Sequence, residues 1–438
     1  MDTQALHFAA DILQQEQQTD AFDYRIVLMQ NHETTIAFRN GEAESLQQST
    51  ARSLALNLMI DGRDGFFYTN NTQPEELEHF IRQAILTTRI LEPDPCRSLA
   101  DPSRYYRGDG PELRNCDHQI PRIDPIEKIK LVQENQSQVQ GSDSRIISAQ
   151  TRYSDRVHRA HYLISNGFQG YEESSRCSLS TILTMEGDEG QHPMDGWGET
   201  RIFFRDMPTE GIADIALQRT RQKIGQRPTH SGNYTLIVES PVAGHLLQPL
   251  LTAMSGQALQ GRMSFLADQL GKTVLSPLAH LVDDPLIPGT RGACHFDYDG
   301  VATQRRTLFD HGTLETYFID TPHSKKLGIA PTTQGIHHLI MEPGTQDLQG
   351  LMKEAGKAIV VTDFNGGNCD PATGNFSYGI EGYLVENGQP SQPISGMNIT
   401  GNMLGLWQRL VSVGNDSDPW ETELIPSLTF EGVQFGGI

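Results

Sequence analysis

The spacing of apolar residues predicts helices and strands in turn through the first 92 residues. Apolar side chains recur every three or four positions over residues 5–18, which is typical of a helix. Strands are expected over three ranges, 24–30, 34–39 and 53–60. A second helix is expected over 74–91, since a proline stands in its first turn and acidic residues follow it. Residues 1–92 are therefore predicted to form an N-terminal αβ region with antiparallel strands.

A proline-rich stretch separates this region from the next. Residues 93–123 contain five prolines and little periodicity, so they are predicted to be a linker. The central α+β region, 124–229, is expected to be rich in strands, with a helix over 125–138 and strands over 146–154, 158–165 and 170–183. The acidic, glycine-rich segment 186–199 is predicted to be a mobile, solvated loop.

Strand patterns dominate from residue 230 to the end. After a strand over 234–238, a helix is expected over 240–254, with Ser240 as its N-cap and Pro241 as its first residue. Pro249 should kink this helix. Asp-His-Gly and Glu-Asn-Gly sequences beginning at residues 310 and 386 are typical of hairpin turns. Residues 230–438 are predicted to be a β-rich C-terminal domain, which makes the whole chain α+β.

The charge and cysteine content narrow the class of protein. The 438 residues carry 34 basic and 55 acidic side chains, a formal net charge of −21, which argues against binding nucleic acid or an anionic membrane. No apolar run approaches the roughly eighteen residues of a membrane span, and the first residues do not resemble a signal peptide. Five widely spaced cysteines favour a reducing compartment. We therefore expect a cytoplasmic protein.

The histidines of this chain do not follow the known patterns of metal ligands. A zinc peptidase helix usually supplies two histidines on one face, with a glutamate beside the first. Only His32 is followed by glutamate, and no second histidine returns on that face. The adjacent His337 and His338 would point to opposite sides of a strand. Motifs of nucleotide-binding proteins and serine hydrolases are absent. No metal site of this chain's own is predicted.

One segment resembles a metal-binding helix that has lost its ligands. Residues 239–248 resemble that helix in the TldD/PmbA family, described as modulators of DNA gyrase, whose TldD members carry His-Glu-x-x-x-His. The first histidine and the glutamate fall on Ser240 and Pro241, and the second histidine falls on His245. A proline cannot polarise water, and one imidazole cannot hold zinc alone. The resemblance thus implies degenerate motif positions and no catalytic residue.

Further segments carry the same resemblance across most of the chain. They share the family's glycine-rich or acidic patterns and lie at 41–45, 296–305, 311–314, 366–377, 386–388 and 399–403. The residues that flank Cys369 follow the PmbA pattern, also called TldE. The resemblance implies a non-catalytic PmbA/TldE-like subunit that supports cleavage of unfolded or extended peptides by a zinc-bearing TldD-type partner. Zinc would belong to the partner, and no cofactor is expected in this chain.

Two alternatives remain open. The chain is otherwise a homo-oligomeric peptide-binding protein, or a hydrolase whose metal site is not recognisable in the sequence. A dimer is expected in each case, either a homodimer or a heterodimer with a TldD-like subunit. A peptide would add as a strand along the glycine-rich edge. Its predicted contacts are Gly366, Gly367, Asn368, Phe376 and Ser377. Any link to DNA gyrase is expected to be indirect.

Overall fold

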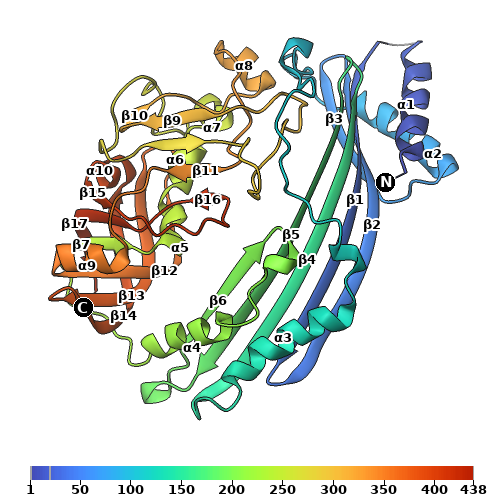
Figure 1. The fold of residues 1–438 in the computed structure, drawn as a ribbon. Helices are drawn as coiled ribbons and strands as arrows, with labels where there is room; N and C mark the ends of the chain where they lie inside the picture. Colours follow the sequence, from blue (N-terminus) through green and yellow to red (C-terminus); the bar gives the residue numbers. More distant parts are fainter. Residues whose placement is uncertain (1, 19–20, 438) are drawn as a thin grey trace.

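The α+β class is confirmed. The computed structural model describes residues 2–18 and 21–437. A long antiparallel sheet from the first half of the chain faces a strand-rich C-terminal domain (Figure 1). No helix in the described part of the chain is both long and apolar enough to cross a bilayer.

The long sheet has the strand order β3-β2-β1-β4-β5-β6. Its strands are β1 (Asp23–Arg39), β2 (Glu42–Ile60), β3 (Arg63–Thr69), β4 (Ile146–Ile164), β5 (Gln169–Met185) and β6 (Met194–Arg201). At its centre β1 pairs with β4 from Arg25↔Ile164 to Arg39↔Gln150. Regions 1–92 and 124–229 therefore contribute three strands each to one sheet.

Three predictions about these strands need correction. The strands expected separately over 146–154 and 158–165 form one strand, β4, because residues 155–157 also pair with β1. The separate strands expected over 24–30 and 34–39 form one strand, because Asn31, His32 and Glu33 pair with both β2 and β4. The acidic segment 186–199, predicted to be a loop, is one only as far as residue 193; residues 194–199 belong to β6, which pairs with β5 at Trp197↔Thr181. Pairing with a long neighbouring strand outweighs the low strand propensity of its glycines.

Helices cover the sheet at its two ends (Figure 1). α1 (Gln4–Gln17) and α2 (Pro74–Thr88) pack on β1 and β2, whereas α3 (Pro125–Val139) and α4 (Ile212–Gln222) pack on β4, β5 and β6. Asp124 caps α3 by accepting a hydrogen bond from the backbone of Ile126. Lys128 of α3 forms a fully buried ion pair with Asp155 of β4, at 2.6 Å.

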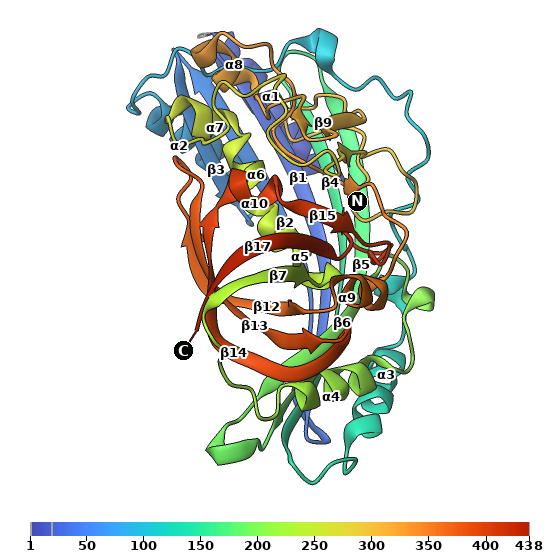
Figure 2. The ribbon, with the colours of Figure 1, turned by 90° about the vertical axis from the view of Figure 1, so that its left-hand side faces the viewer.

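The C-terminal domain is built on a closed sheet. Its strands are β7 (Gly232–Val238), β12 (Ala358–Cys369), β13 (Asn375–Glu386), β14 (Gln389–Asn402), β15 (Leu410–Val413) and β17 (Leu428–Gly436). The order is β14-β13-β12-β7-β17-β15, and an additional pairing of β14 with β17 closes five of them into a barrel. Figure 2 shows these strands curving around one another.

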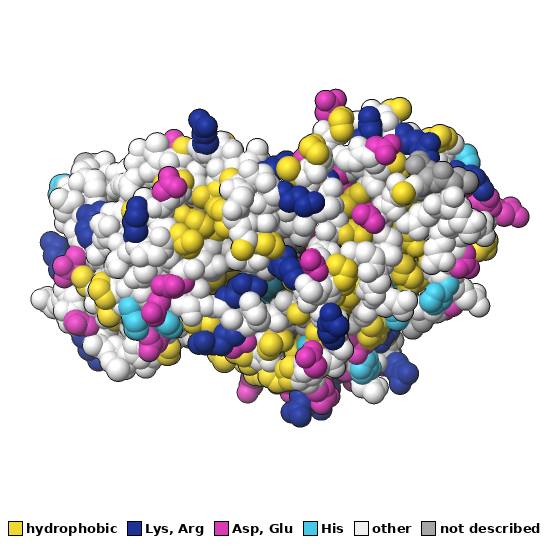
Figure 3. Space-filling view, turned by 90° about the horizontal axis from the view of Figure 1, so that it is seen from above, with side chains coloured by type: hydrophobic (Ala, Val, Ile, Leu, Met, Phe, Trp, Pro, Cys, Tyr) yellow, Lys and Arg dark blue, Asp and Glu magenta, His cyan; other side chains and the backbone are white. Residues whose placement is uncertain are grey.

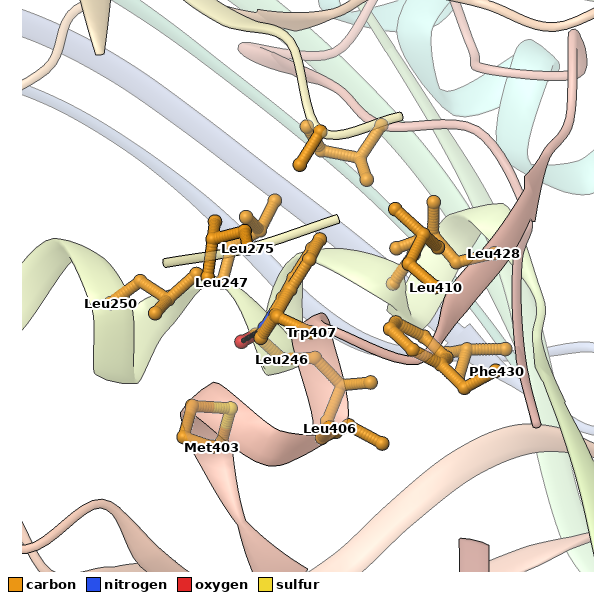
Figure 4. Packing of buried hydrophobic residues seen from close by; sticks show 14 of the residues in the cluster. Leu246, Leu247, Leu250, Leu275, Met403, Leu406, Trp407, Leu410, Leu428 and Phe430 are labelled. Atoms are coloured by element: carbon orange, nitrogen blue, oxygen red, sulfur yellow. Dashed lines mark hydrogen bonds between the residues drawn. The ribbon is translucent and has the colours of Figure 1, made fainter. Parts of the chain in front are cut away.

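A smaller sheet completes this domain. Its order is β10-β9-β8-β11-β16, with β8 (Leu281–Asp283), β9 (Arg306–Asp310), β10 (Thr313–Leu314), β11 (Leu339–Met341) and β16 (Glu423–Leu424). The short helices α7 (Gly256–Gln260), α8 (Thr321–Leu327), α9 (Leu348–Ala355) and α10 (Met403–Trp407) lie around the two sheets. Trp407 is fully buried in the core, packs edge-on against Phe430 and donates a hydrogen bond to the carbonyl of Leu246 (Figure 4).

Candidate functional site

The predicted helix 240–254 is broken into short pieces. They are α5 (Ser240–Ala243), a 3₁₀ turn (Gly244–Leu246) and α6 (Gln248–Ala253). Pro249 explains the break, because a proline has no N–H and its ring collides with the carbonyl four residues earlier, that of His245. The sequence predicts a helix kinked at Pro249, and the structure shows a full interruption that already begins at Gly244.

Ser240 does not act as the N-cap. Glu239 holds that position, and Ser240 is the first residue of α5. The hydroxyl of Ser240 donates to the carbonyl of Ile425 at 2.7 Å, and its backbone N–H donates to Ser427 Oγ at 3.0 Å. These contacts fasten α5 to the C-terminal segment beside it. The Ser240 hydroxyl is therefore already engaged with a backbone carbonyl.

Ser240 and Pro241 line a cavity of about 770 Å³ between the two halves of the molecule. β5 and β6 form one wall, α5 forms another, and the segment 416–425 forms the third. Seen from above, Lys and Arg side chains gather around a hollow near the middle of the molecule (Figure 3). The cavity is large enough for several residues of an extended chain.

The walls of this cavity combine tryptophan rings with arginines. Arg201 lies over the ring of Trp420, 4.6 Å from its centroid, and Arg219 lies 5.4 Å from the centroid of Trp197. Cation–π pairs of this kind favour contact with both aromatic and polar groups. The sequence pattern does not reveal Arg201, Arg219 and Trp420, since each stands alone in the sequence and only folding brings them together.

An ion-pair network joins the long sheet to the C-terminal barrel. Arg219 of α4 donates to both carboxylate oxygens of Glu239, at 3.0 and 3.1 Å. Lys223 contacts Asp195 at 3.1 Å and Glu381 at 2.8 Å. Burial raises the pKa of Glu239, although Arg219 opposes this shift. The network fixes the position of α4, which carries Arg219 into the cavity wall.

His245 lies against β12 and β13. Its ring stacks on Phe364, with centroids 4.4 Å apart, and meets Tyr378 edge-on at 4.8 Å. Burial lowers the pKa of His245, while Asp363 partly opposes this effect, so the neutral imidazole is favoured. Within residues 2–18 and 21–437, the groups of three potential metal ligands are Cys116, His118 and Glu173, and His280, His311 and Glu342. Neither group includes His245.

The predicted peptide contacts come together in the β12–β13 hairpin. Asn368 pairs with Ser377 and Gly367 with Tyr378, whereas Phe376 pairs with Cys369 and Gly366 lies in a register shift. Phe376 is buried and stacks on Tyr378, whereas Gly366, Gly367 and Asn368 are exposed. The hairpin therefore lies beside His245, and the substrate-binding role of the five residues stays a prediction.

One edge of β12 lacks a neighbouring strand. The pairing of β7 with β12 extends only as far as Val361, because β7 ends at Val238 and the chain then enters α5. In the described part of the chain, the remainder of β12 from Asp363 to Cys369 pairs with β13 alone. An unpaired strand edge exposes backbone donors and acceptors that can bind another extended chain.

Comparison with known proteins places this geometry in a family. Family models of three PmbA/TldA metallopeptidase domains match this chain: domain 1 at residues 24–87, the central domain at 119–224 and the C-terminal domain at 231–437. The chain belongs to the PmbA/TldD metallopeptidase family. The sequence resemblance would place the first histidine and the glutamate of the TldD-type motif at Ser240 and Pro241. Ser240 is bound to Ile425, Pro241 has no basic atom, and His245 lies between aromatic rings, so these residues do not fit a zinc ion.

Individual relatives agree with this assignment. The chain is 27% identical over 391 residues to the metalloprotease PmbA of Escherichia coli O157:H7, covering 87% of this chain and 85% of that protein. A crystal structure from Bacteroides thetaiotaomicron, of a candidate modulator of DNA gyrase, is 41% identical with a TM-score of 0.96, covering 99% and 98% of the two chains. A structure of TldE from Thermococcus kodakarensis, at 20% identity, has a TM-score of 0.83 and covers 98% and 100% of the chains; it supports the fold alone.

Proposed function

We propose that this chain is a non-catalytic PmbA/TldE-like subunit of a cytoplasmic peptidase. A TldD-type partner would carry the zinc ion and cleave unfolded or extended peptides. The observation that carries this proposal is the chemistry at Ser240 and Pro241, which supply neither an imidazole nor a carboxylate. Without those groups the chain has no means here of holding zinc or of taking a proton from bound water.

Two surfaces support a role in handling peptides. The free edge of β12 from Asp363 to Cys369 provides backbone groups for an added strand. The cavity between the sheets provides the rings of Trp197 and Trp420 together with Arg201 and Arg219. A peptide on the β12 edge would lie beside the rings of Phe364 and His245, which stack on each other at this edge.

The decisive experiment compares the chain alone with the chain and its partner. Purified protein is incubated with a fluorogenic, flexible peptide, either alone or with a His-Glu-x-x-x-His homologue from the same genome. We expect no hydrolysis by this chain alone and chelator-sensitive hydrolysis by the pair. A partner whose zinc-binding histidine is replaced by alanine serves as the matched control and should be inactive. Chelator-sensitive hydrolysis by this chain alone would favour the alternative of a hydrolase and refute the proposal.

A binding experiment addresses the strand edge separately. An extended peptide is compared with the same peptide carrying N-methyl groups at alternate residues, which removes backbone donors and leaves the side chains unchanged. We expect the methylated peptide to bind much more weakly, since strand addition depends on backbone hydrogen bonds. Equal binding of the two peptides would contradict binding on the β12 edge. Tight peptide binding by a homodimer that gains no activity with a partner would favour the peptide-binding alternative.

A further inference from the structure

Four potential metal ligands meet at one end of the smaller C-terminal sheet. Leu281 of β8 pairs with Phe309 of β9 on one side and with Met341 of β11 on the other. β8 runs antiparallel to both neighbours. The residue before Leu281 and the residues after Phe309 and Met341 therefore lie at the same end of the sheet. The residues placed there are His280, Asp310, His311 and Glu342.

The ligand atoms of these residues are close together. One ligand atom each from His280, His311 and Glu342 lie within 4.8 Å of one another. Asp310 Oδ1 lies 3.1 Å from His280 Nδ1 and 3.9 Å from His311 Nε2. Ligand atoms around a tetrahedral zinc ion are about 3.4 Å apart, given metal–ligand distances near 2.1 Å. Small side-chain rotations would bring His280, His311 and Glu342 to that spacing, and Asp310 lies beside both histidines.

Hydrogen bonds around the cluster favour coordination. His311 Nδ1 lies 3.1 Å from the carbonyl oxygen of Pro277, which can only accept, so Nδ1 donates there and Nε2 is the nitrogen that faces the cluster. Histidine ligands of metals are commonly oriented in this way. His280 Nδ1 is enclosed and has no hydrogen bond within the described residues. The carboxylate of Asp310 lies 3.1 Å from that atom.

The backbone holds the ligands in place. The Glu342 N–H donates to the carbonyl of His280 at 3.0 Å, which ties two of the strand ends together. His311 adopts a left-handed conformation, with φ of 46°, in the turn that joins β9 to β10. Gly312, with φ of 84°, lies so close to the Leu275 carbonyl that a Cβ there would stand 2.3 Å from its oxygen. The turn therefore has little freedom to move His311 away from the cluster.

We propose that His280, Asp310, His311 and Glu342 form a binding site for a divalent transition metal, with zinc as the ion that best suits the ligands. Two imidazoles and two carboxylates are a donor set that zinc accepts in proteins. The bound ion would join β8, β9 and β11 at one end of the sheet. This site is separate from Ser240, Pro241 and His245 and is independent of the proposed peptidase role.

The other cluster, Cys116, His118 and Glu173, is less suited to a metal. The guanidinium of Arg159 already contacts two of these side chains, at 3.5 Å from Glu173 and 3.4 Å from His118 Nδ1. Burial raises the pKa of Cys116 to about 12, which opposes formation of the thiolate that binds metals. We therefore use this cluster as the internal control.

The test measures zinc binding by the full-length chain after chelator treatment. Isothermal titration with Zn²⁺ is carried out on the unmodified chain and on His311→Asn, Glu342→Gln and His118→Asn. Asparagine tolerates the left-handed conformation at position 311, and glutamine keeps the shape of Glu342, so both variants should fold. Circular dichroism confirms folding.

We expect one zinc ion per chain, bound equally well by the unmodified protein and by His118→Asn. His311→Asn and Glu342→Gln should each bind zinc at least about tenfold more weakly. Substituted Co²⁺ should show no thiolate-to-metal charge-transfer band, because no cysteine is in the ligand set. Absence of stoichiometric zinc binding, wild-type affinity in either ligand variant, or loss of binding in His118→Asn would each overturn the proposal.

Discussion

Gly366 and Gly367 allow the steric contribution of one side-chain atom to be measured in the β12–β13 hairpin. Both glycines have positive φ, 127° and 99°. A Cβ at Gly366 would meet nothing within 4 Å, whereas a Cβ at Gly367 would stand 1.9 Å from the carbonyl oxygen of Ser377. Gly366→Ala is therefore a matched control for Gly367→Ala, since it changes the backbone preference without creating an overlap.

The expected loss of stability follows from these contacts. The unfavourable φ costs about 1–3 kcal/mol in either variant. At Gly367 the neighbouring strand must also move. The new Cβ would lie 1.9 Å from the Ser377 oxygen, whereas ordinary contact between such atoms begins near 3.4 Å. Forced overpacking typically costs a further 1–3 kcal/mol, so Gly367→Ala should lose about that much more free energy of unfolding than Gly366→Ala.

Urea denaturation provides the measurement. Both variants are made in a Trp197→Phe, Trp420→Phe background, so that fluorescence comes only from Trp407, which is buried in the C-terminal core. We expect the unfolding midpoint to fall further for Gly367→Ala than for Gly366→Ala, with an unchanged slope. Equal losses in the two variants would refute the steric explanation and leave backbone conformation as the only cause.

Three further predictions concern buried groups elsewhere. Asp155→Asn leaves the buried Lys128 without its partner and should lower the free energy of unfolding, measured by urea titration, by about 3–5 kcal/mol. The double change Lys128→Met, Asp155→Leu should recover most of this loss, because no charge is then buried. A loss under about 1 kcal/mol for the single variant would contradict this prediction. Burial alone would lower the pKa of His337, but Asp283 and Cys294 raise it from 6.5 to about 10. The folded state therefore holds this proton more tightly, and the resulting stability is complete below pH 6.5 and is lost as the pH rises through about 10. His337→Gln should flatten the dependence of the thermal midpoint on pH across that window, and an unchanged profile would exclude His337 as its source. Trp407→Ala removes a fully buried ring and should lower the free energy of unfolding, measured by urea denaturation, by about 3–5 kcal/mol. Trp407→Phe keeps most of the ring volume and should be closer to the unmodified chain, whereas equal losses would mean that the hydrogen bond to Leu246 matters more than ring volume.

Local patterns predicted the element types well where the surroundings agree with them. The helix over 125–138 and the hairpins at 310–312 and 386–388 follow from capping residues and positive-φ turn residues, and the structure contains all three. The strand at residues 194–199 is not predicted, because the glycines there carry no strand signal of their own. This strand forms because β5 extends far enough to pair with it.

The candidate site shows the same division. The degenerate motif at Ser240, Pro241 and His245 was readable, since it depends on residue types at fixed spacing. The cavity was not readable, because Trp197 and Trp420 are 223 positions apart in the sequence and meet only through long-range packing. The cluster around His280 depends on strand register, which the short strands β8, β9 and β11 do not reveal locally.

The pairing of β1 with β4 bears on how this protein can be divided. A fragment that ends before residue 119 would retain β1 but lose the strand that covers one side of it. The exposed border would run from Arg25 to Arg39, long enough to attract a second copy of the fragment. Expression of the first family module by itself should therefore yield aggregates or intertwined oligomers, and soluble material should require both modules on one polypeptide.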